Sequence, residues 1–534
     1  MEKKDFKYIL TLIPITFIAF FSTVWIRPAD LMEARNFITA REMILNDNFI
    51  VPTLNGSLRF EKPPLPTWLT AGIMKLTENF TDEYILRIPS ALCGILFIIL
   101  LYCFVKYMTK DSFKSFITSF VGATTFMIIK ISNENAWDIY TYVFAFGGVL
   151  FLIKGFQQEK IFNFFISGIF IACSILSKGP VGIYGLIFPF LISYSATYGL
   201  GDYQKNWKKI VFAFLIGIIF SGIWFGLMYI KYPEIFLNVM KKEENTWNTL
   251  HTESFIYYMD YFVYMGVWIF FSVVGLFKSW NKKRTDNKEY YKFVFLWNIL
   301  VILFLSFIQM KKKRYGLPIY MTSIMEVGII CSYYYDKLWY ELKKSDKILL
   351  YIQSVFMLIL SIAIPILFFF KGYVYEKISS LYMGAILLIF SIFGYLILKF
   401  ILGKEKTMKF IILGSGVFML IVNLTTNWFF DKTLVKKAYG SSNYNELKLV
   451  RKNPPKYDIY AQNFEIEDVW RFGKNIKKYE NYKIEKNVLP DNLVFLGEVP
   501  KEILKEYKVL KKEIYIKDDG HLAELNYLKK FMEA

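Results

Sequence analysis

Apolar runs long enough to cross a bilayer recur along this chain from Tyr8 to Trp428 and limit its fold more than any other feature. A helix needs about 20 mostly apolar residues to span the hydrocarbon core. Apolar residues make up 55% of the chain, and aromatic residues, which favour membrane interfaces, make up 19%. The sequence therefore predicts a polytopic α-helical membrane protein with about 13 transmembrane helices. The predicted spans are 8–26, 88–108, 114–131, 137–154, 161–177, 180–199, 209–231, 256–277, 292–310, 315–335, 348–370, 378–400 and 408–428.

The distribution of lysine predicts the orientation of these spans. If the N-terminus is cytoplasmic, every short loop that falls inside carries Lys, as the positive-inside rule requires. These loops are 110–114, 154–160, 205–209, 278–292, 337–347 and 404–409. The first loop, 27–87, then lies outside, with amphipathic helices expected in it.

One run of charges breaks this pattern. Lys311-Lys312-Lys313-Arg314 falls on the outer side, where four adjacent cations are unfavourable for topology. Such a cluster suits an anion site at the headgroup layer, for example a lipid-linked phosphate. The alternatives are a miscounted span and a cluster of snorkelling side chains.

The character of the chain changes near Phe429. Polar residues dominate beyond it, and short β-like runs occur at Tyr457–Ala461, Leu493–Leu496 and Glu513–Lys517. We predict a transmembrane domain at 1–428 and a small α/β soluble domain at 429–534 on the outer face.

The formal net charge of +19 does not indicate nucleic-acid binding, because much of the Lys and Arg lies in short inter-span loops. Cys93, Cys103, Cys173 and Cys331 all fall in apolar spans without disulfide or metal spacing, so we expect inert thiols.

Acids and bases fill the first loop. Asp30 and Glu33 share a face if their turn is helical, and Arg35 follows them. A carboxylate at the membrane surface beside basic groups suits a general base. The simpler interpretation is that Asp30 caps a helix.

Three more charged residues flank predicted spans. Asp138 lies at the outer end of a span next to Trp137, where it either lines an outward-facing cavity or sits in headgroup water. Lys62 precedes two prolines that stiffen its backbone. Lys178 lies at a Lys-Gly-Pro break between two spans, and irregular backbone at that depth indicates a polar cavity. With the 311–314 cluster, these cations could neutralise a phosphate leaving group.

Metal binding is a weaker hypothesis. The chain has two histidines, and His251 lies in an outer loop near Glu253. A metal role for His251 with Glu61 or Glu253 is conceivable, but a lone surface histidine is more often structural, so a divalent metal is left open and no cofactor is expected to be required.

The motifs of the first loop resemble a known family. Asp30, Arg41-Glu42-Met43 and Phe60-Glu61-Lys62-Pro63-Pro64-Leu65-Pro66 resemble the first outer loop of the bacterial aminoarabinose transferases, which belong with the protein O-mannosyltransferases among the glycosyltransferases of the C fold. Lys178-Gly179-Pro180-Val181-Gly182 and Arg314-Tyr315-Gly316-Leu317-Pro318 resemble later motifs. One departure stands out: Met32 occupies the place where many members have the Asp of an Asp-Glu pair, while Glu33 keeps the Glu.

The resemblance implies a function. The family takes a sugar from a polyprenyl-phosphate donor on the outer side of the cytoplasmic membrane and transfers it, with inversion, to a lipid or protein acceptor. Asp30 and Glu33 are then the candidate catalytic carboxylates. Candidate residues for binding the donor phosphate or sugar are Arg35, Arg59, Glu61, Lys62, Asp138, Lys178, Lys313, Arg314 and Tyr315.

Three other functions compete with the transfer of a sugar to a lipid A-like acceptor. One of them, a polytopic scaffold or sensor whose outer domain binds a partner, leaves the first-loop motif and the outer cation cluster unexplained. A protein O-glycosyltransferase differs only in its acceptor. A transporter or flippase of lipid-linked sugars predicts ionisable residues at mid-membrane and two similar halves. Here the acids cluster at the outer surface and the halves differ, which favours an enzyme.

Overall fold

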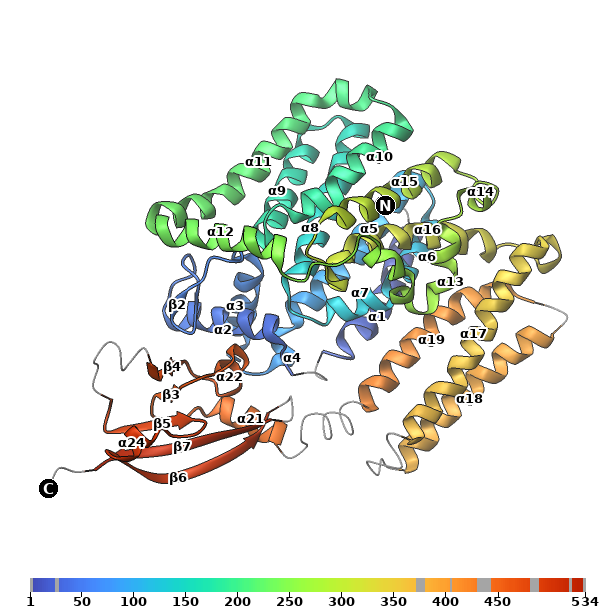
Figure 1. Ribbon diagram of the computed structural model, residues 1–534. Helices are drawn as coiled ribbons and strands as arrows, with labels where there is room; N and C mark the ends of the chain where they lie inside the picture. Colours follow the sequence, from blue (N-terminus) through green and yellow to red (C-terminus); the bar gives the residue numbers. More distant parts are fainter. Residues whose placement is uncertain are drawn as a thin grey trace. The chain divides into compact units, whose positions relative to one another are not determined.

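Helices dominate the computed structural model, which describes residues 3–24, 28–370, 380–403, 406–429, 443–480, 489–517 and 521–531 (Figure 1). Two compact units make up the chain. We call Met1–Thr23, Phe60–Pro66 and Pro89–Thr426 the helical unit, and Val24–Arg59, Thr67–Ile88 and Asn427–Ala534 the mixed unit.

The helical unit follows the predicted apolar runs. Its helices are α1 (Lys3–Phe21), α5 (Ile88–Thr109), α6 (Ser112–Ala123), α7 (Phe126–Ser132), α8 (Trp137–Gln158), α9 (Ile161–Lys178), α10 (Phe188–Tyr198), α11 (Gly201–Lys231), α12 (Pro233–Thr249), α13 (Ile269–Gly275), α14 (Lys278–Asn281), α15 (Lys288–Phe307), α16 (Leu317–Tyr335), α17 (Lys344–Phe368), α18 (Ser380–Leu402) and α19 (Met408–Phe429). Four short 3-10 or π segments join them: η1 (Ile183–Ile187), η2 (Phe255–Trp268), η3 (Lys313–Gly316) and η4 (Trp339–Glu341).

Nine helices in the described part of the chain are long and apolar enough to cross a membrane. The count becomes ten if α6 and α7, which meet at a bend of 65°, form one span. The 13 predicted spans are therefore not confirmed. The differences have local causes: α1 opens with Lys3, Lys4 and Asp5, and α10 has only 11 residues. The turn predicted between spans 348–370 and 378–400 lies outside the described residues.

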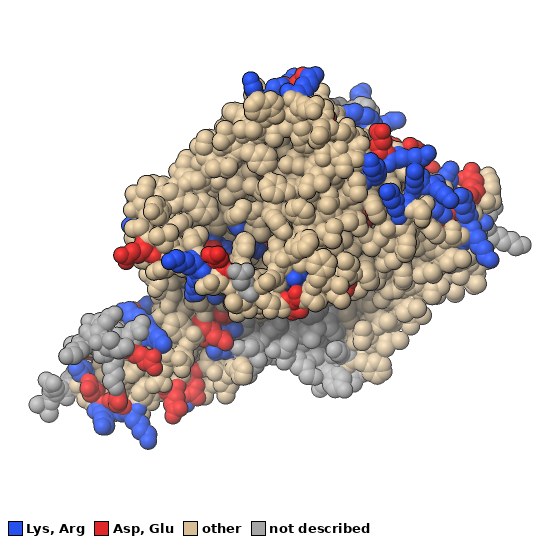
Figure 2. Space-filling model, turned by 45° about the horizontal axis from the view of Figure 1, so that its top comes forward, with Lys and Arg blue, Asp and Glu red and all other residues tan. Residues whose placement is uncertain are grey.

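The surface of the helices agrees with a membrane environment. Figure 2 shows Lys and Arg side chains gathered near the ends of the helices, with a broad face between them that is almost free of charge. Large apolar side chains on this unit are exposed, such as Ile223 on α11 and Leu388 on α18. A soluble protein rarely exposes so much continuous apolar surface, whereas lipid tails cover it without cost.

The mixed unit joins helices from the first loop to a small sheet. The loop supplies α2 (Leu31–Leu45), β1 (Thr53–Leu54), β2 (Ser57–Leu58), most of α3 (Leu65–Thr77), and α4 (Glu83–Leu86). The C-terminal part supplies α21 (Asn443–Lys452), β3 (Ile459–Ala461), α22 (Ile466–Arg471), β4 (Ile476–Lys478), β5 (Asn492–Leu496), α24 (Lys501–Leu504), β6 (Tyr507–Ile516) and β7 (Leu522–Lys530).

The sheet has the strand order β4-β3-β5-β7-β6. Strands β4, β3 and β5 are parallel, while β7 pairs antiparallel with β5 and β6. The three predicted β runs coincide with β3, β5 and β6, so these strands are confirmed. The predicted boundary at residue 428 adjoins residues outside the described part, and an independent domain at 429–534 stays a prediction.

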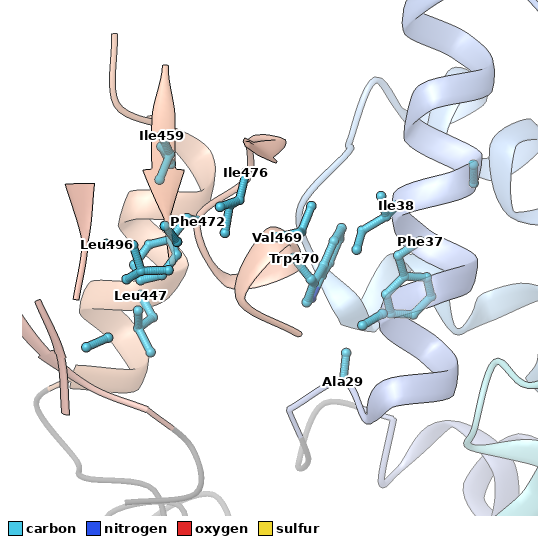
Figure 3. Close-up of a cluster of buried hydrophobic side chains, with 14 of the residues drawn as sticks. Ala29, Phe37, Ile38, Leu447, Ile459, Val469, Trp470, Phe472, Ile476 and Leu496 are labelled. Carbon is cyan, nitrogen blue, oxygen red and sulfur yellow. The ribbon is translucent and has the colours of Figure 1, made fainter. Parts of the chain in front are cut away.

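One apolar core holds the mixed unit together. Figure 3 shows Trp470 of α22 beside Phe37 of α2, with Ile459 and Ile476 of the sheet in the same cluster. The rings of Phe37 and Trp470 lie 5.0 Å apart, and Trp470 is 1% exposed. The indole nitrogen of Trp470 donates to Glu83 of α4 over 2.8 Å. The core thus binds first-loop helices to the C-terminal strands, although Glu83 and Trp470 are 387 positions apart in the sequence.

Trp470→Ala tests this core. The change leaves a cavity and removes the hydrogen bond to Glu83, so we expect it to lower the free energy of unfolding of the mixed unit by about 3–5 kcal/mol. Amide hydrogen exchange of α2 in detergent is expected to speed up. Trp207→Ala, which removes a tryptophan that is 57% exposed on α11, serves as the control. Equal exchange of α2 in both variants would contradict the account.

Candidate functional site

Three elements of the helical unit bring charged side chains together around Asp138. Asp138 lies in the first turn of α8, and Lys178 lies in the last turn of α9. Gly179 ends α9 with a φ of +77°, a conformation that favours glycine, and Pro180 follows. Because α8 and α9 are consecutive antiparallel helices, the start of one meets the end of the other.

Asp138 is a buried carboxylate between two cations. Its Oδ1 lies 2.5 Å from the Lys178 ammonium, and its Oδ2 lies 3.6 Å from Nε of Arg314 on η3. Asp138 is 2% exposed. One carboxylate thus faces two cations in a largely buried place. A phosphate diester, which carries one negative charge, is an anion that such cations could bind.

The aromatic ring of Tyr315 lies against the Lys178 ammonium. The ammonium lies 3.8 Å from the centre of the Tyr315 ring, a cation–π distance. The Tyr315 hydroxyl is a phenol and can donate a hydrogen bond.

Lys62 joins this group from the first loop. Its ammonium pairs with Glu243 of α12 over 2.8 Å. Lys62 acts electrostatically on Tyr315, and Glu243 acts on Lys178. The structure thus brings together five of the predicted donor-binding residues, which we call the Asp138 cluster: Lys62, Asp138, Lys178, Arg314 and Tyr315.

Lys313 does not join the cluster. Its ammonium contacts both carboxylate oxygens of Asp260 at 2.7 and 2.8 Å and the carbonyl of Tyr257 at 2.9 Å. Its neighbour Lys311 donates to the carbonyl of Glu253 over 2.9 Å. The cations of the 311–314 run therefore have separate partners, and Arg314 is the one that faces Asp138.

The two candidate catalytic carboxylates lie in the mixed unit and differ in their surroundings. Asp30 is exposed and caps α2, with Oδ1 accepting from the amides of Met32 and Glu33 at 2.9 Å each. Glu33 is 0% exposed, and both its oxygens accept from Arg87 at 2.7 Å. The capping interpretation of Asp30 is confirmed, and it leaves a carboxylate at the surface.

The remaining predicted residues are distributed over both units. Arg35 is half-buried on α2. Arg59 is 6% exposed and donates to the Thr39 hydroxyl over 3.2 Å within the mixed unit. Glu61 belongs to the helical unit, and its buried Oε2 has no hydrogen-bond partner among the described residues.

No metal site accompanies these groups in the part of the chain that the structure describes. Within those residues, no group of three or more His, Cys, Asp or Glu side chains is arranged to hold a metal ion. The His251 residue is exposed, has a φ of +52°, and its backbone carbonyl accepts from the Lys311 amide. All four cysteines are free thiols, as expected.

The sequence analysis missed the partners of the predicted cations. Glu243 and Asp260 neutralise Lys62 and Lys313, yet each lies in an ordinary-looking polar or aromatic segment. The sequence feature that could have indicated Glu243 is the pair of adjacent acids Glu243-Glu244 in a predicted outer loop. Arg41 was also missed as a buried cation: it is 6% exposed beside Trp470, and burial lowers its pKa to about 10.

A comparison with protein families matches residues 61–225 to the family "Dolichyl-phosphate-mannose-protein mannosyltransferase". Among curated relatives, an uncharacterized protein of Aquifex aeolicus is 25% identical over 325 residues, which cover 59% of this chain and 62% of the relative. The undecaprenyl phosphate-alpha-4-amino-4-deoxy-L-arabinose arabinosyl transferase of Aeromonas hydrophila is 21% identical, covering 76% of this chain and 73% of the relative.

The fold matches a solved structure over almost its whole length. ArnT from Cupriavidus metallidurans, bound to undecaprenyl phosphate, superposes with a TM-score of 0.71 at 14% identity, and the match covers 97% of each chain. At that identity the likeness shows the fold. The family and sequence matches agree with the resemblance seen in the sequence: the chain is similar to the aminoarabinose transferases and the protein O-mannosyltransferases, which are membrane glycosyltransferases.

Proposed function

We propose that this protein is an inverting glycosyltransferase that takes a sugar from a polyprenyl-phosphate donor. The observation that carries the proposal is the Asp138 cluster, in which Lys178 and Arg314 share one buried carboxylate. In the reaction, the bond between the anomeric carbon and the phosphate oxygen breaks, and its electron pair goes to the phosphate. Cations fixed at that oxygen stabilise the transition state more than the ground state.

The names of the relatives support this class of donor. The Aeromonas relative is named for an undecaprenyl phosphate-linked sugar, the matched family for dolichyl-phosphate mannose, and the solved ArnT structure holds undecaprenyl phosphate. In all three the carrier is a polyprenyl phosphate. The Asp138 cluster would hold the phosphate, with Lys178 and Arg314 as the main cations and the Tyr315 hydroxyl as a further donor.

The acceptor needs a general base, and Asp30 is the better of the two candidates. Glu33 is fully buried, and both its oxygens accept hydrogen bonds from Arg87, so it has little freedom to take a proton. Asp30 is exposed at the start of α2. A base that removes the acceptor proton while the phosphate leaves from the opposite side gives inversion at the anomeric carbon.

The proposed acceptor is a lipid A-like lipid or another component of the cell envelope, on the outer side of the cytoplasmic membrane. The lysines of the short inner loops support the outer placement, and the cation run at 311–314, which breaks that pattern, is explained by an anion site on the outer side. The family match at 61–225 favours a second candidate, a protein acceptor. Thirteen spans and an outer C-terminal domain at 429–534 belong to the same topological proposal.

Lys178→Gln tests the central cation. Losing a fixed charge at the leaving group is expected to lower turnover about 10²–10³-fold. The readout is the release of polyprenyl phosphate from a crude mixture of polyprenyl-phosphate-linked sugars by purified protein in detergent. The matched control is Lys205→Gln, because Lys205 forms an exposed pair with Glu159 at the same 2.5 Å. Equal turnover in the two folded variants would remove Lys178 from the mechanism.

Lys62→Ala tests the contribution of the first loop. Lys62 is half-buried, so its loss is expected to leave thermal stability almost unchanged and to lower turnover roughly tenfold or more, because its charge acts on the cluster. The control is Lys241→Ala, which removes an exposed lysine from α12. If Lys62→Ala lowers the melting temperature and the turnover in proportion, the role of Lys62 is structural instead.

Asp30→Asn and Glu33→Gln separate a base from a structural carboxylate. Asn caps helices as well as Asp, so Asp30→Asn is expected to fold normally and to lose nearly all transfer. Glu33→Gln breaks a buried ion pair, which costs about 3–5 kcal/mol, so it is expected to lower stability first. Full transfer by Asp30→Asn would exclude Asp30 as the base. The measurements are sugar transfer and thermal unfolding of each variant.

A further inference from the structure

A second polar cavity lies in the helical unit, away from the Asp138 cluster. Its volume is about 240 Å³, and it is lined by the end of α5, the start of α6, the segment before α15 and the end of α16. Helix α16 begins beside Arg314 and Tyr315 and ends at the cavity. At 1.5 Å per residue its 19 residues separate the two places by about 28 Å. The cavity and the Asp138 cluster therefore lie at opposite ends of α16.

Charged side chains line this cavity. The cations are Lys114, Arg284 and Lys337, and the acids are Asp111, Asp286 and Asp336. Asp111 is occupied as the cap of α6, accepting from two amides, and the Asp286 side chain is 93% exposed. Asp336 is also exposed. The three acids are thus engaged with the backbone or exposed to solvent, so they hold the lysines only weakly.

The side chain of Arg284 is held in a fixed position in the wall of the cavity. It is 5% exposed, its Nε lies 2.5 Å from the Asp346 carboxylate, and its guanidinium stacks 3.9 Å from the Trp280 ring. Lys114, by contrast, only approaches Asp111 at 3.7 Å and Asp286 at 3.5 Å. These long, partly exposed pairs are weak, so the Lys114 ammonium can turn to a stronger anion at little cost.

The segments that supply most of the lining are strongly basic. Residues 110–114, 278–292 and 337–347 carry twelve Lys or Arg and five Asp or Glu. Tyr290 also lines the cavity, and its hydroxyl, in a residue 3% exposed, has no hydrogen-bond partner in the described part of the chain. An unsatisfied buried hydroxyl costs about 1–3 kcal/mol, which a bound polar group would offset.

We propose that this cavity binds the phosphate ester of an anionic phospholipid headgroup. It lies at the ends of membrane-spanning helices, where headgroups are, and basic pockets between such helices bind anionic lipids. Its volume is below the roughly 300–1,000 Å³ of pockets for drug-sized ligands, so it suits a headgroup. The site is separate from the proposed transfer reaction and needs neither donor nor acceptor.

Lipid retention tests the site. The intact protein is reconstituted in nanodiscs of phosphatidylcholine with or without phosphatidylglycerol, and bound lipid is counted by native mass spectrometry after release. We expect selective retention of phosphatidylglycerol. The double variant Lys114→Gln, Lys337→Gln is expected to lower retention roughly tenfold or more, at about 1 kcal/mol per cation. Equal retention of the two lipids by the wild type would overturn the proposal.

The control keeps the same change in charge. Lys282→Gln with Lys283→Gln removes two exposed lysines from the same basic segment that do not line the cavity. Near-normal retention in this control supports a built site, whereas an equal loss in both double variants means diffuse attraction and overturns it. A third arm measures the binding of glycerol 3-phosphate in phosphatidylcholine nanodiscs: if it binds this cavity more tightly than phosphatidylglycerol does, the ligand is a soluble phosphate ester and the lipid proposal is overturned.

Discussion

The ion pair between Asp138 and Lys178 is the constraint on which the proposed site depends. It joins the first turn of α8 to the last turn of α9, which are the places where helix dipoles favour an acid and a cation. The dipoles of both helices therefore favour the pair, and the pair holds the start of α8 beside the end of α9. Arg314 reaches the second oxygen of Asp138 from η3, so the carboxylate also positions the segment that begins α16.

Burying these charges costs free energy, so the arrangement would be a poor way to stabilise the fold. A buried ion pair gains little over apolar packing, because both charges lose their hydration, and here a second cation also faces the carboxylate. An enzyme that must hold a phosphate leaving group has a use for two cations at one place. The mixed unit shows a contrasting case: Glu33 and Arg87 satisfy each other with two 2.7 Å bonds, and Arg451 and Trp470 both donate to Glu83. The groups in those pairs neutralise one another's charges and hydrogen-bond to one another, so the pairs stabilise the fold.

Much of this was predictable from the sequence. The apolar runs gave the helical membrane architecture, and three β runs gave strands, because both signals are local. Lys62, Lys178 and Arg314 were predicted as site residues because each lies at a Pro or Gly break or in a charge run on the unexpected side, and their role stays a prediction. Their partners were not predicted: Glu243 lies 181 positions from Lys62, and no local pattern marks that contact. The number of 13 spans is not confirmed, because helices such as α10, with 11 residues, and α1, with a charged start, are not among the helices that are long and apolar enough to cross a membrane.

The most direct test of the central claim compares two lipids that differ only in the phosphate. Binding of a polyprenyl phosphate and of the corresponding polyprenol to the purified wild-type protein can be measured by native mass spectrometry at matched concentrations. If the Asp138 cluster is a phosphate site, the phosphate lipid binds at least tenfold more tightly, a difference of about 1.4 kcal/mol. Equal binding of the two lipids would show that the protein recognises only the polyprenyl chain, and it would contradict the role assigned to Lys178 and Arg314.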